Sequence, residues 1–228
     1  MITSRDNERL KLVRKLESRR WRDKLGLFAV EGEDLVESAA AAGLEPVDLL
    51  VAGDNVAPEV LASVSTMAHA PRAIGVYRRD DLPRLESTSN RLLLGLALWY
   101  VADPGNVGTL LRTADAFGAF VALSEGCADR TGPKAARASM GALFRVPVSS
   151  FDDAPGRRVA LVAGAGTPLP ELELAPGTTF VLGAEREGLP DEVVAACDEV
   201  AHIPIASESL NVAAAGAIAL YDWSRRAG

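Results

Sequence analysis

Five polar residues in the C-terminal half of the chain have the types and positions needed to orient a substrate and to stabilise charge. They are Asn106, Arg112, Glu185, Ser209 and Asn211. They lie in three separate segments, the first two of which directly follow apolar runs of strand length. Side-chain amides, a carboxylate and a hydroxyl can position a reacting group, and a guanidinium can stabilise negative charge that develops on it. These segments are therefore the candidate functional site.

Each candidate also has a purely structural interpretation. Asn106, in the turn sequence Asp-Pro-Gly-Asn, could be a helix N-cap, and Arg112 could be a surface cation on the same helix. Glu185 could be a carboxylate at a helix start, and Ser209 could be another helix cap. The residue types alone do not decide between these interpretations and a functional site.

Several common kinds of site have no support in the sequence. No G-x-G-x-x-G follows the first apolar run of the C-terminal half, and no G-x-x-x-x-G-K-[ST] occurs, so neither a dinucleotide fold nor a P-loop is expected. Cys127 and Cys197 lack metal-ligand spacing and are expected to be small buried thiols. His69 and His202 have no partners at a useful spacing, so both are expected to be structural. We expect no metal and no disulfide framework.

The composition predicts a globular protein without a membrane segment. The 228 residues are 48% hydrophobic, enough for one large domain or two small ones. No apolar run approaches the roughly 18 residues of a membrane helix, and the N-terminus has no apolar signal core. We therefore expect a cytoplasmic protein with no membrane partner.

Charge is distributed unevenly along the chain. The formal net charge is −7, which by itself argues against a nucleic-acid partner. Residues 1–24, however, contain nine Lys or Arg and four Asp or Glu, a net of +5, so the remaining 204 residues carry −12. A basic arm on an acidic body is a plausible electrostatic footprint for phosphate contact. A solvated helix face is the alternative, because runs of charge are commonly that.

The N-terminal third alternates between short helical and strand patterns. Residues 5–24 are predicted to form one basic amphipathic helix, with a partial apolar stripe at Leu10, Val13, Leu16 and Trp21. Strands are then predicted at 27–30, 47–51 and 73–78, and helices at 31–42 and 57–64. The polar, aperiodic segment 79–90 is predicted to be a linker. Together these elements predict a small α/β unit.

The C-terminal part has the βα alternation that is typical of a parallel sheet covered on both faces. Strands are predicted at 92–101, 120–123, 144–148, 159–163 and 180–183. A helix after Asn106 has a core stripe at Val107, Leu110, Leu111, Ala114 and Phe117. The helix after Asn211 is small and apolar almost all round, which predicts a buried helix. In such sheets, ligands bind at the carboxyl ends of the strands.

The three segments resemble motifs 1, 2 and 3 of the SpoU/TrmH family, the RNA ribose 2′-O-methyltransferases of the SPOUT superfamily. They run from Asp103 to Gly118, from Leu182 to Leu189 and from Ile203 to Val212, in the order and at the spacing that this family uses. The segment from Gly26 to Gly32 is similar to the substrate-binding domain of SpoU-type rRNA methyltransferases, which has a ribosomal-protein-like fold. That similarity fades after Thr66, and Ile205 stands where methionine is common in the family.

The resemblance implies an α/β fold with an RNA substrate-binding domain at 1–80, a linker at 81–90 and a trefoil-knotted SPOUT methyltransferase domain at 91–228. It implies S-adenosylmethionine as the cofactor, and a homodimer with the active site near the subunit boundary. The implied reaction is methyl transfer to a ribose 2′-hydroxyl in RNA, with 23S rRNA favoured over tRNA. A tRNA methyltransferase and a non-catalytic RNA-binding or assembly protein are the alternatives.

The resemblance also implies a role for each candidate residue. Asn106, Arg112, Glu185, Ser209 and Asn211 match catalytic or supporting positions, with Glu185 expected near Arg112; Gly183, Ile203 and Leu210 match positions that hold the cofactor. Arginine stays protonated, so Arg112 is expected to stabilise charge or orient a phosphate rather than act as a base. RNA contacts are expected from Arg130, Lys134 and Arg137, in a segment that faces RNA in the family, and, on charge alone, from Arg5, Arg9, Arg19, Arg20 and Arg22 of the basic arm.

Overall fold

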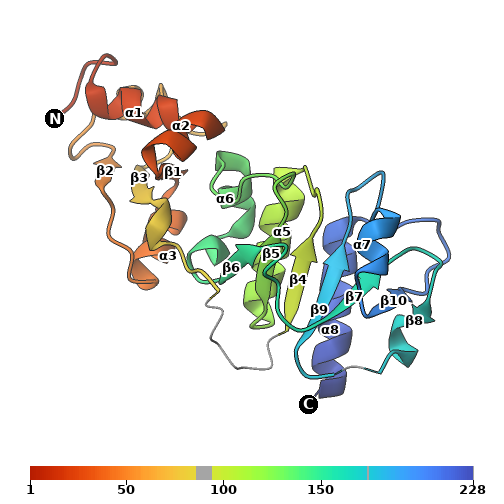
Figure 1. The fold of residues 1–228 in the computed structure, drawn as a ribbon. Helices are drawn as coiled ribbons and strands as arrows, with labels where there is room; N and C mark the ends of the chain where they lie inside the picture. The colour runs from red at the N-terminus through yellow and green to blue at the C-terminus, as the bar shows by residue number, and fades with distance from the viewer. Residues whose placement is uncertain (86–93, 174, 228) are drawn as a thin grey trace.

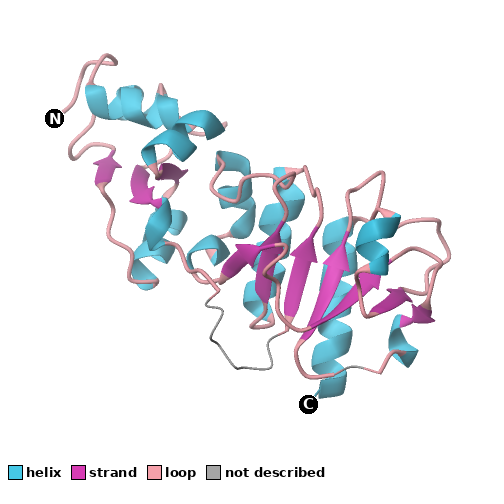
Figure 2. Ribbon diagram, viewed as in Figure 1, coloured by secondary structure: helices cyan, strands magenta, loops and turns pink. Residues whose placement is uncertain are grey.

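The computed structural model describes residues 1–85, 94–173 and 175–227, and it divides them between two β-sheets (Figures 1 and 2). In the N-terminal part, β1 (Leu27–Glu31), β3 (Ala73–Arg78) and β2 (Asp48–Val51) form an antiparallel sheet in that order. The helices of this part are α1 (Glu8–Leu16), α2 (Arg19–Leu25), α3 (Glu33–Ala41) and α4 (Pro58–Ala62). Leu10 and Val13 of α1 share a hydrophobic core with Leu50 and Ile74 of the sheet. The strands predicted here, and the two helices predicted after β1, are confirmed with small shifts at their ends.

The basic N-terminal helix is divided in two. We predicted one helix over 5–24, but α1 ends at Leu16 and α2 begins at Arg19. The Arg22 guanidinium turns back and donates to the carbonyl oxygens of Leu16 and Glu17, at 2.8 Å each. In a continuous helix these carbonyl groups would accept hydrogen bonds from backbone N–H groups, and here the guanidinium satisfies them instead. The prediction of a single helix is therefore wrong.

The larger sheet is parallel throughout its described strands. Its order is β6 (Val148–Ser150), β5 (Phe120–Leu123), β4 (Gly95–Leu98), β9 (Thr178–Leu182), β7 (Arg157–Leu161), β10 (Glu199–His202) and β8 (Thr167–Pro168). The helices around it are α5 (Pro104–Ala116), α6 (Pro133–Ser139), α7 (Asp191–Ala195) and α8 (Val212–Ala227), and short 3₁₀ helices lie at Arg79–Asp81, Ala142–Phe144 and Leu169–Glu171. The predicted α/β fold with a parallel sheet is confirmed.

Helices cover both faces of this sheet at its centre. The strands β4 and β9 are buried along their whole lengths. Leu96 and Leu98 of β4 face a core that includes Leu110 of α5. Ala97, between them, faces a second core that includes Val193 of α7. Burial on both faces explains why this strand reads as a continuous apolar run in the sequence.

Some predicted boundaries in the C-terminal part differ from the structure. We predicted a strand over 144–148, but Phe144 ends a 3₁₀ helix and β6 begins only at Val148. The Phe144 ring packs instead against Phe28 and Tyr77 of the N-terminal part, with centroid separations of 6.3 and 5.8 Å. The short strands β8 and β10 were not predicted.

The predicted linker at 81–90 and the first residues of the predicted strand at 92–101 lie partly outside the described residues. Among the described residues of that predicted strand, only Gly95–Leu98 form a strand, β4.

The C-terminal helix α8 is buried on one face only. Ala219 and Leu220 are fully buried, whereas 38% of Ile218 and 57% of Tyr221 are exposed. The prediction of a helix buried all round is therefore wrong for a single chain. No helix in the described ranges is both long and apolar enough to cross a membrane.

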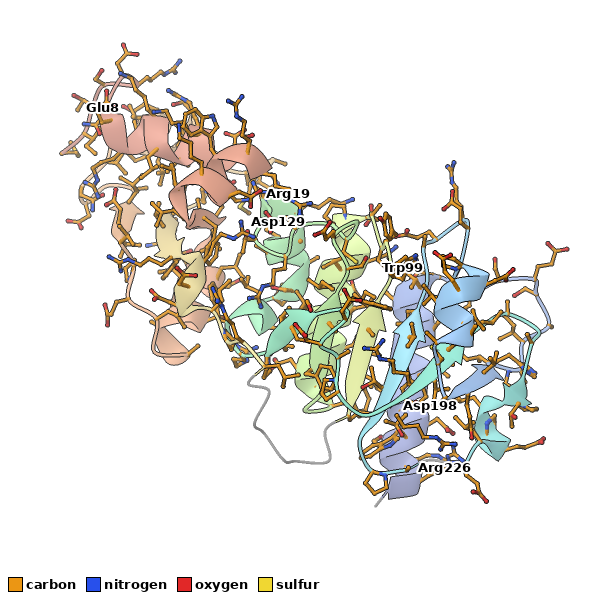
Figure 3. The ribbon with its side chains drawn as sticks, in the orientation of Figure 1. Glu8, Arg19, Trp99, Asp129, Asp198 and Arg226 are labelled. Carbon is orange, nitrogen blue, oxygen red and sulfur yellow. The ribbon has the colours of Figure 1, made fainter. Side chains whose placement is uncertain are left out.

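The two parts of the chain meet through a polar contact as well as through aromatic packing. Arg22 of α2 forms a buried ion pair with Asp129, with Nε and Oδ2 separated by 2.9 Å. Figure 3 shows Asp129, with Arg19 of α2, at this junction. Arg137 of α6 also donates to Thr66 at 2.8 Å. The N-terminal part is therefore packed on the C-terminal part rather than joined to it only through the chain.

Candidate functional site

The three candidate segments emerge from one edge of the parallel sheet. The first follows β4, the second follows β9, and the third follows β10. The strands β4 and β9 are neighbours, and β10 lies beyond β7 in the same sheet. Because parallel strands end at a common edge, the sheet brings together segments that are far apart in sequence.

Asp103 organises the first segment. Its side chain caps α5 by accepting from the backbone N–H groups of Gly105, at 2.7 Å, and Asn106, at 3.0 Å. Lys134 of α6 donates to its other oxygen at 2.9 Å, and this bond is the largest cause of the lowered pKa of Asp103. Since Asp103 is the N-cap, the cap interpretation of Asn106 is wrong, and the Asn106 side chain is available for other contacts. This role of Asp103 was not among our predictions, although Asp followed by Pro is a common helix start.

Asn106 joins the three candidate segments. Its Nδ2 donates to Glu185 Oε1 at 3.0 Å, and its Oδ1 accepts from Nδ2 of Asn211 at 3.2 Å. The backbone N–H of Asp103 also points to Glu185 Oε1, at 3.3 Å. The predicted grouping of Asn106, Glu185 and Asn211 therefore corresponds to one hydrogen-bonded network.

The charge of Glu185 determines the orientation of this network. Partial burial acts to raise the pKa of the Glu185 carboxyl, but hydrogen bonds from Asn106 and from backbone N–H groups outweigh it and hold the pKa below its usual value of 4.5. An ionised carboxylate accepts but cannot donate. Asn106 must therefore present its NH₂ to Glu185 and its carbonyl oxygen to Asn211.

The third segment enters α8 through Asn211. Its Oδ1 accepts from the backbone N–H groups of Ala213, at 2.9 Å, and Ala214, at 3.2 Å, so Asn211 caps the helix while its NH₂ reaches Asn106. The cap interpretation of Ser209 is therefore wrong. Ser209 is exposed, and within the described part of the chain its hydroxyl makes no hydrogen bond. The structure does not bring Ser209 into the network.

Arg112 also lies apart from the network. It is exposed on α5, and it makes no hydrogen bond or ion pair with any residue that the structure describes. Six residues separate it from Asn106, about 9 Å along a helix axis. Among described residues, the side-chain partner of Glu185 is Asn106, and no hydrogen bond or ion pair joins Glu185 to Arg112 within the single chain. The expectation that Glu185 lies near Arg112 stays a prediction.

A cavity of about 690 Å³ lies beside the third segment. It is lined by Ala163, Gly164 and the run from His202 to Glu208, and this lining includes Ile203. Its size is within the range of small-molecule sites, and backbone groups of an irregular loop can bind a polar ligand. Leu210 is 38% exposed and, like Gly183, does not line the cavity. The cavity is therefore large enough for a small-molecule cofactor, and one of the three predicted cofactor residues, Ile203, lies in its wall.

The tight packing around position 183 explains why this residue is a glycine. A Cβ atom there would overlap the backbone of Gly188, because the turn between Ala184 and Gly188 folds back against it. That turn is closed by two backbone hydrogen bonds of 3.0 Å between Ala184 and Gly188. The glycine keeps the Glu185 turn compact.

The predicted RNA contacts of the basic arm divide into exposed and internal residues. Arg5, Arg19 and Arg20 are exposed. Arg9 instead bonds Asp48, with Nε and Oδ2 separated by 2.8 Å. Arg22 is only 4% exposed and is bonded to Asp129, so its prediction as an RNA contact is wrong: the ion pair holds it inside the protein.

The three basic residues after β5 contact other parts of the chain. Lys134 donates a hydrogen bond to the Asp103 carboxylate. Arg137 donates a hydrogen bond to the Thr66 hydroxyl, and its Nη1 lies 3.8 Å from Glu31 Oε1. Arg130 is largely buried, and burial, with the nearby Arg79 charge, lowers its pKa to about 10. Lys134 is the most exposed of the three side chains and remains available to a ligand.

The α/β fold with this parallel sheet matches the solved structure of an rRNA methyltransferase, which gives the class of protein to which the chain belongs. Residues 94–221 match the SpoU rRNA Methylase family, and residues 7–79 match the MRM3-like substrate binding domain. The chain therefore belongs to the SpoU rRNA methylase family, as its three motifs predicted.

Similarity to individual proteins extends over nearly the whole chain. The chain is 30% identical to 23S rRNA (guanosine(2553)-2′-O)-methyltransferase RlmP of Bacillus subtilis, over 96% of this chain and 97% of that protein. It is 31% identical to the uncharacterized tRNA/rRNA methyltransferase slr1673 of Synechocystis, over 99% of this chain and 93% of that protein. The crystal structure of AdoMet-bound rRNA methyltransferase from Sinorhizobium meliloti has a TM-score of 0.88 and 26% identity, and the match covers 99% of this chain and 97% of that one.

Proposed function

We propose that this protein transfers a methyl group from S-adenosylmethionine to a ribose 2′-hydroxyl in RNA, with 23S rRNA as the substrate favoured over tRNA. The observation that carries the proposal is the Asn106 amide, which bonds both Glu185 and Asn211 and so assembles the three motifs at one edge of the sheet. The preference for 23S rRNA is supported by the full-length similarity to RlmP and by the substrate-binding domain match at 7–79.

The residues that would hold the cofactor surround the cavity of about 690 Å³. Ile203 and the backbone that follows it form one wall, and we propose that Gly183 and Leu210 contact the cofactor from beside the cavity. The cofactor supplies a methyl group on a sulfonium, which is already electrophilic and needs no metal. The protein has to bind it, exclude water and orient the hydroxyl that receives the methyl group.

The network residues would orient that hydroxyl. Glu185 is ionised and already accepts from Asn106, so it holds the amide rigid at the edge of the site. Since a guanidinium is a cation and not a base, we propose that Arg112 stabilises the developing alkoxide or binds the neighbouring phosphate. A substrate phosphate or bulk water would accept the proton. Ser209 is exposed on the loop that leads to Asn211 and α8, and it is available to the substrate.

We also propose a homodimer in which a second copy covers the exposed face of α8. Ile218 and Tyr221 lie three residues apart, on one face of that helix, and both are exposed in the single chain. Helix α8 packs against α5, where Leu110 contacts Gly216. Since α5 carries Arg112, a dimer built on this face would place the subunit boundary near the catalytic arginine.

The division into domains at 1–80, 81–90 and 91–228 is part of the same proposal. It is supported by the two sheets and by the separate family matches at 7–79 and 94–221. We further propose a trefoil knot in the C-terminal domain, a cytoplasmic location, and contacts of the exposed Arg5, Arg19, Arg20 and Lys134 with RNA phosphates.

The experiment that tests the function is transfer of labelled methyl from S-adenosylmethionine to unmodified 23S rRNA and, separately, to tRNA. Label at ribose 2′-hydroxyls of rRNA is expected, and the control variant Arg112→Ala should retain cofactor binding but lose most of the transfer. Label in tRNA alone would show that the substrate is tRNA and not rRNA. Cofactor binding without transfer to free RNA or to ribosomal subunits would favour the non-catalytic RNA-binding protein.

A further inference from the structure

A second cavity adjoins the Glu185 turn. It has a volume of about 410 Å³, and its lining residues are Trp99, Tyr100, Ala184, Glu187, Gly188 and Pro190. It shares no lining residue with the larger cavity. Figure 3 shows Trp99 at the carboxyl end of the central strands, beside α7. The second cavity therefore lies at the edge of the sheet that carries the proposed catalytic residues.

Tyr100 occupies a backbone conformation that a bulky side chain rarely adopts. Its φ angle is +53°, in the left-handed region that favours glycine. Neighbouring bonds hold it there: its N–H donates to Ser124 Oγ at 2.9 Å, and the Val101 carbonyl accepts from Ala128 at 2.9 Å. Strained residues that the surroundings hold in place are concentrated at binding and catalytic sites.

The Tyr100 ring is fixed on one side and exposed on the other. It lies against Gly126, where any Cβ atom would overlap it, and the Trp99 ring is 5.1 Å away between centroids. Trp99 is in turn held edge-on against Phe151 at 5.0 Å. Half of Tyr100 nevertheless remains exposed. A supported aromatic ring with a free face is the arrangement on which proteins stack unpaired RNA bases.

The segment 99–103, which includes the aromatic pair, is hydrogen-bonded at two points to the segment that carries Glu185. The backbone N–H of Trp99 donates to the Leu182 carbonyl at 2.8 Å, and the backbone N–H of Asp103 donates to Glu185 Oε1 at 3.3 Å. Trp99 and Tyr100 therefore keep a constant position relative to Glu185 and Asn106. A base stacked on Tyr100 would leave its ribose close to this network.

Glu187 supplies the charged side chain of the cavity, whose six lining residues all lie in the described ranges. A carboxylate accepts two hydrogen bonds side by side. Among the RNA bases, guanine presents two adjacent N–H donors on its Watson–Crick edge, at N1 and N2.

We propose that this cavity receives the base of the nucleotide whose ribose is methylated, that Tyr100 stacks on the base, and that Glu187 accepts from the edge of a guanine. This assignment rests on the proposed function, and it adds the residues that select the target nucleotide.

The test uses the full chain, an unmodified 23S rRNA transcript and labelled S-adenosylmethionine. Tyr100→Gly removes the ring and suits the positive φ, so the backbone conformation at this position is retained without strain. We expect the KM for the transcript to rise about tenfold, with cofactor affinity by calorimetry unchanged. Tyr100→Phe keeps the ring and should restore most of that loss. Glu187→Gln should lower kcat/KM about tenfold.

The labelled nucleotide is identified by nuclease digestion and mass spectrometry, and 2′-O-methylguanosine is expected. A KM that is unchanged in Tyr100→Gly while the wild type is active would overturn the stacking role alone. Label on another nucleotide would overturn the guanine assignment. A wild-type protein that methylates no RNA would overturn the proposed function, and this assignment with it.

Discussion

The side-chain amide of Asn106 donates to the Glu185 carboxylate across 3.0 Å, although 79 residues separate them in sequence. The same amide accepts from Asn211, 105 residues away, at 3.2 Å. One neutral side chain thus couples a carboxylate at the end of β9 to the cap of α8. The amide is suited to this because it offers a donor and an acceptor on one rigid plane.

We predict that Asn106→Asp lowers the methyl-transfer rate constant by about 100-fold. The variant places a second carboxylate against Glu185, so the two groups repel and the link to Glu185 is lost. Cofactor affinity should change little, because Asn106 does not line the larger cavity. Single-turnover transfer and calorimetry measure the two quantities. Asn106→Ala, which removes the contact without adding charge, should have a smaller effect; equal rates for both variants and the wild type would contradict the role of the network.

The lowered pKa of Glu185 predicts a specific acid sensitivity. A carboxyl whose pKa is depressed by folding contributes stability above its usual value of 4.5, and this contribution is lost as the pH falls through the folded pKa. The free energy of unfolding of Glu185→Gln should therefore differ from the wild type by a constant amount near neutral pH, and the difference should shrink below pH 4.5. Urea denaturation at several pH values measures it. The exposed Glu125→Gln serves as the control, and a difference independent of pH would argue against the assignment.

The sequence predicted the elements well where burial leaves a local pattern. The strands β3 and β5 lie at the predicted residues 73–78 and 120–123. Local pattern could not predict contacts that form only in the folded chain. Arg22 reads as part of a solvated basic arm, but it is bonded to Asp129, which lies 107 residues away. Arg9 likewise bonds Asp48, so charge alone overstated the number of arginines available to RNA.

The buried Arg22–Asp129 pair predicts a large loss of stability when one partner is removed. Both side chains are about 5% exposed. Arg22→Met would leave the Asp129 carboxylate in the interior with Arg79, at 3.4 Å, as its ion-pair partner among the described residues. Breaking a buried pair in this way costs about 3 kcal/mol. Chemical denaturation measures the change. Arg20→Met, an exposed neighbour on α2, is the matched control and should change stability by less than about 0.5 kcal/mol; similar effects of the two variants would show that the junction pair is not structural.

The exposed arginines of α2 predict a salt-dependent contact with RNA. Arg19→Ala and Arg20→Ala should each weaken rRNA binding at low salt. Each should also reduce the slope of log K against log salt concentration by about 0.7, the value for one phosphate contact with a single strand. Filter binding across a salt series measures both. Arg9→Ala is the contrasting variant, because Arg9 is bonded to Asp48 and should affect folding stability more than the salt slope. An unchanged slope in the α2 variants would show that Arg19 and Arg20 do not contact RNA phosphates.

The exposed face of α8 predicts that the protein associates with a second copy of itself. Ile218→Asp places a charge beside Tyr221, within the apolar surface that a dimer would bury. Light scattering should give roughly twice the chain mass of 24.0 kDa for the wild type and the single-chain mass for the variant. Met67→Asp, at an apolar residue of similar exposure in the N-terminal part, should leave the mass unchanged. If the active site lies at the subunit boundary, Ile218→Asp should also lose methyl transfer, although every residue of the Asn106 network is intact. A monomeric variant with full transfer would place the whole active site within one chain.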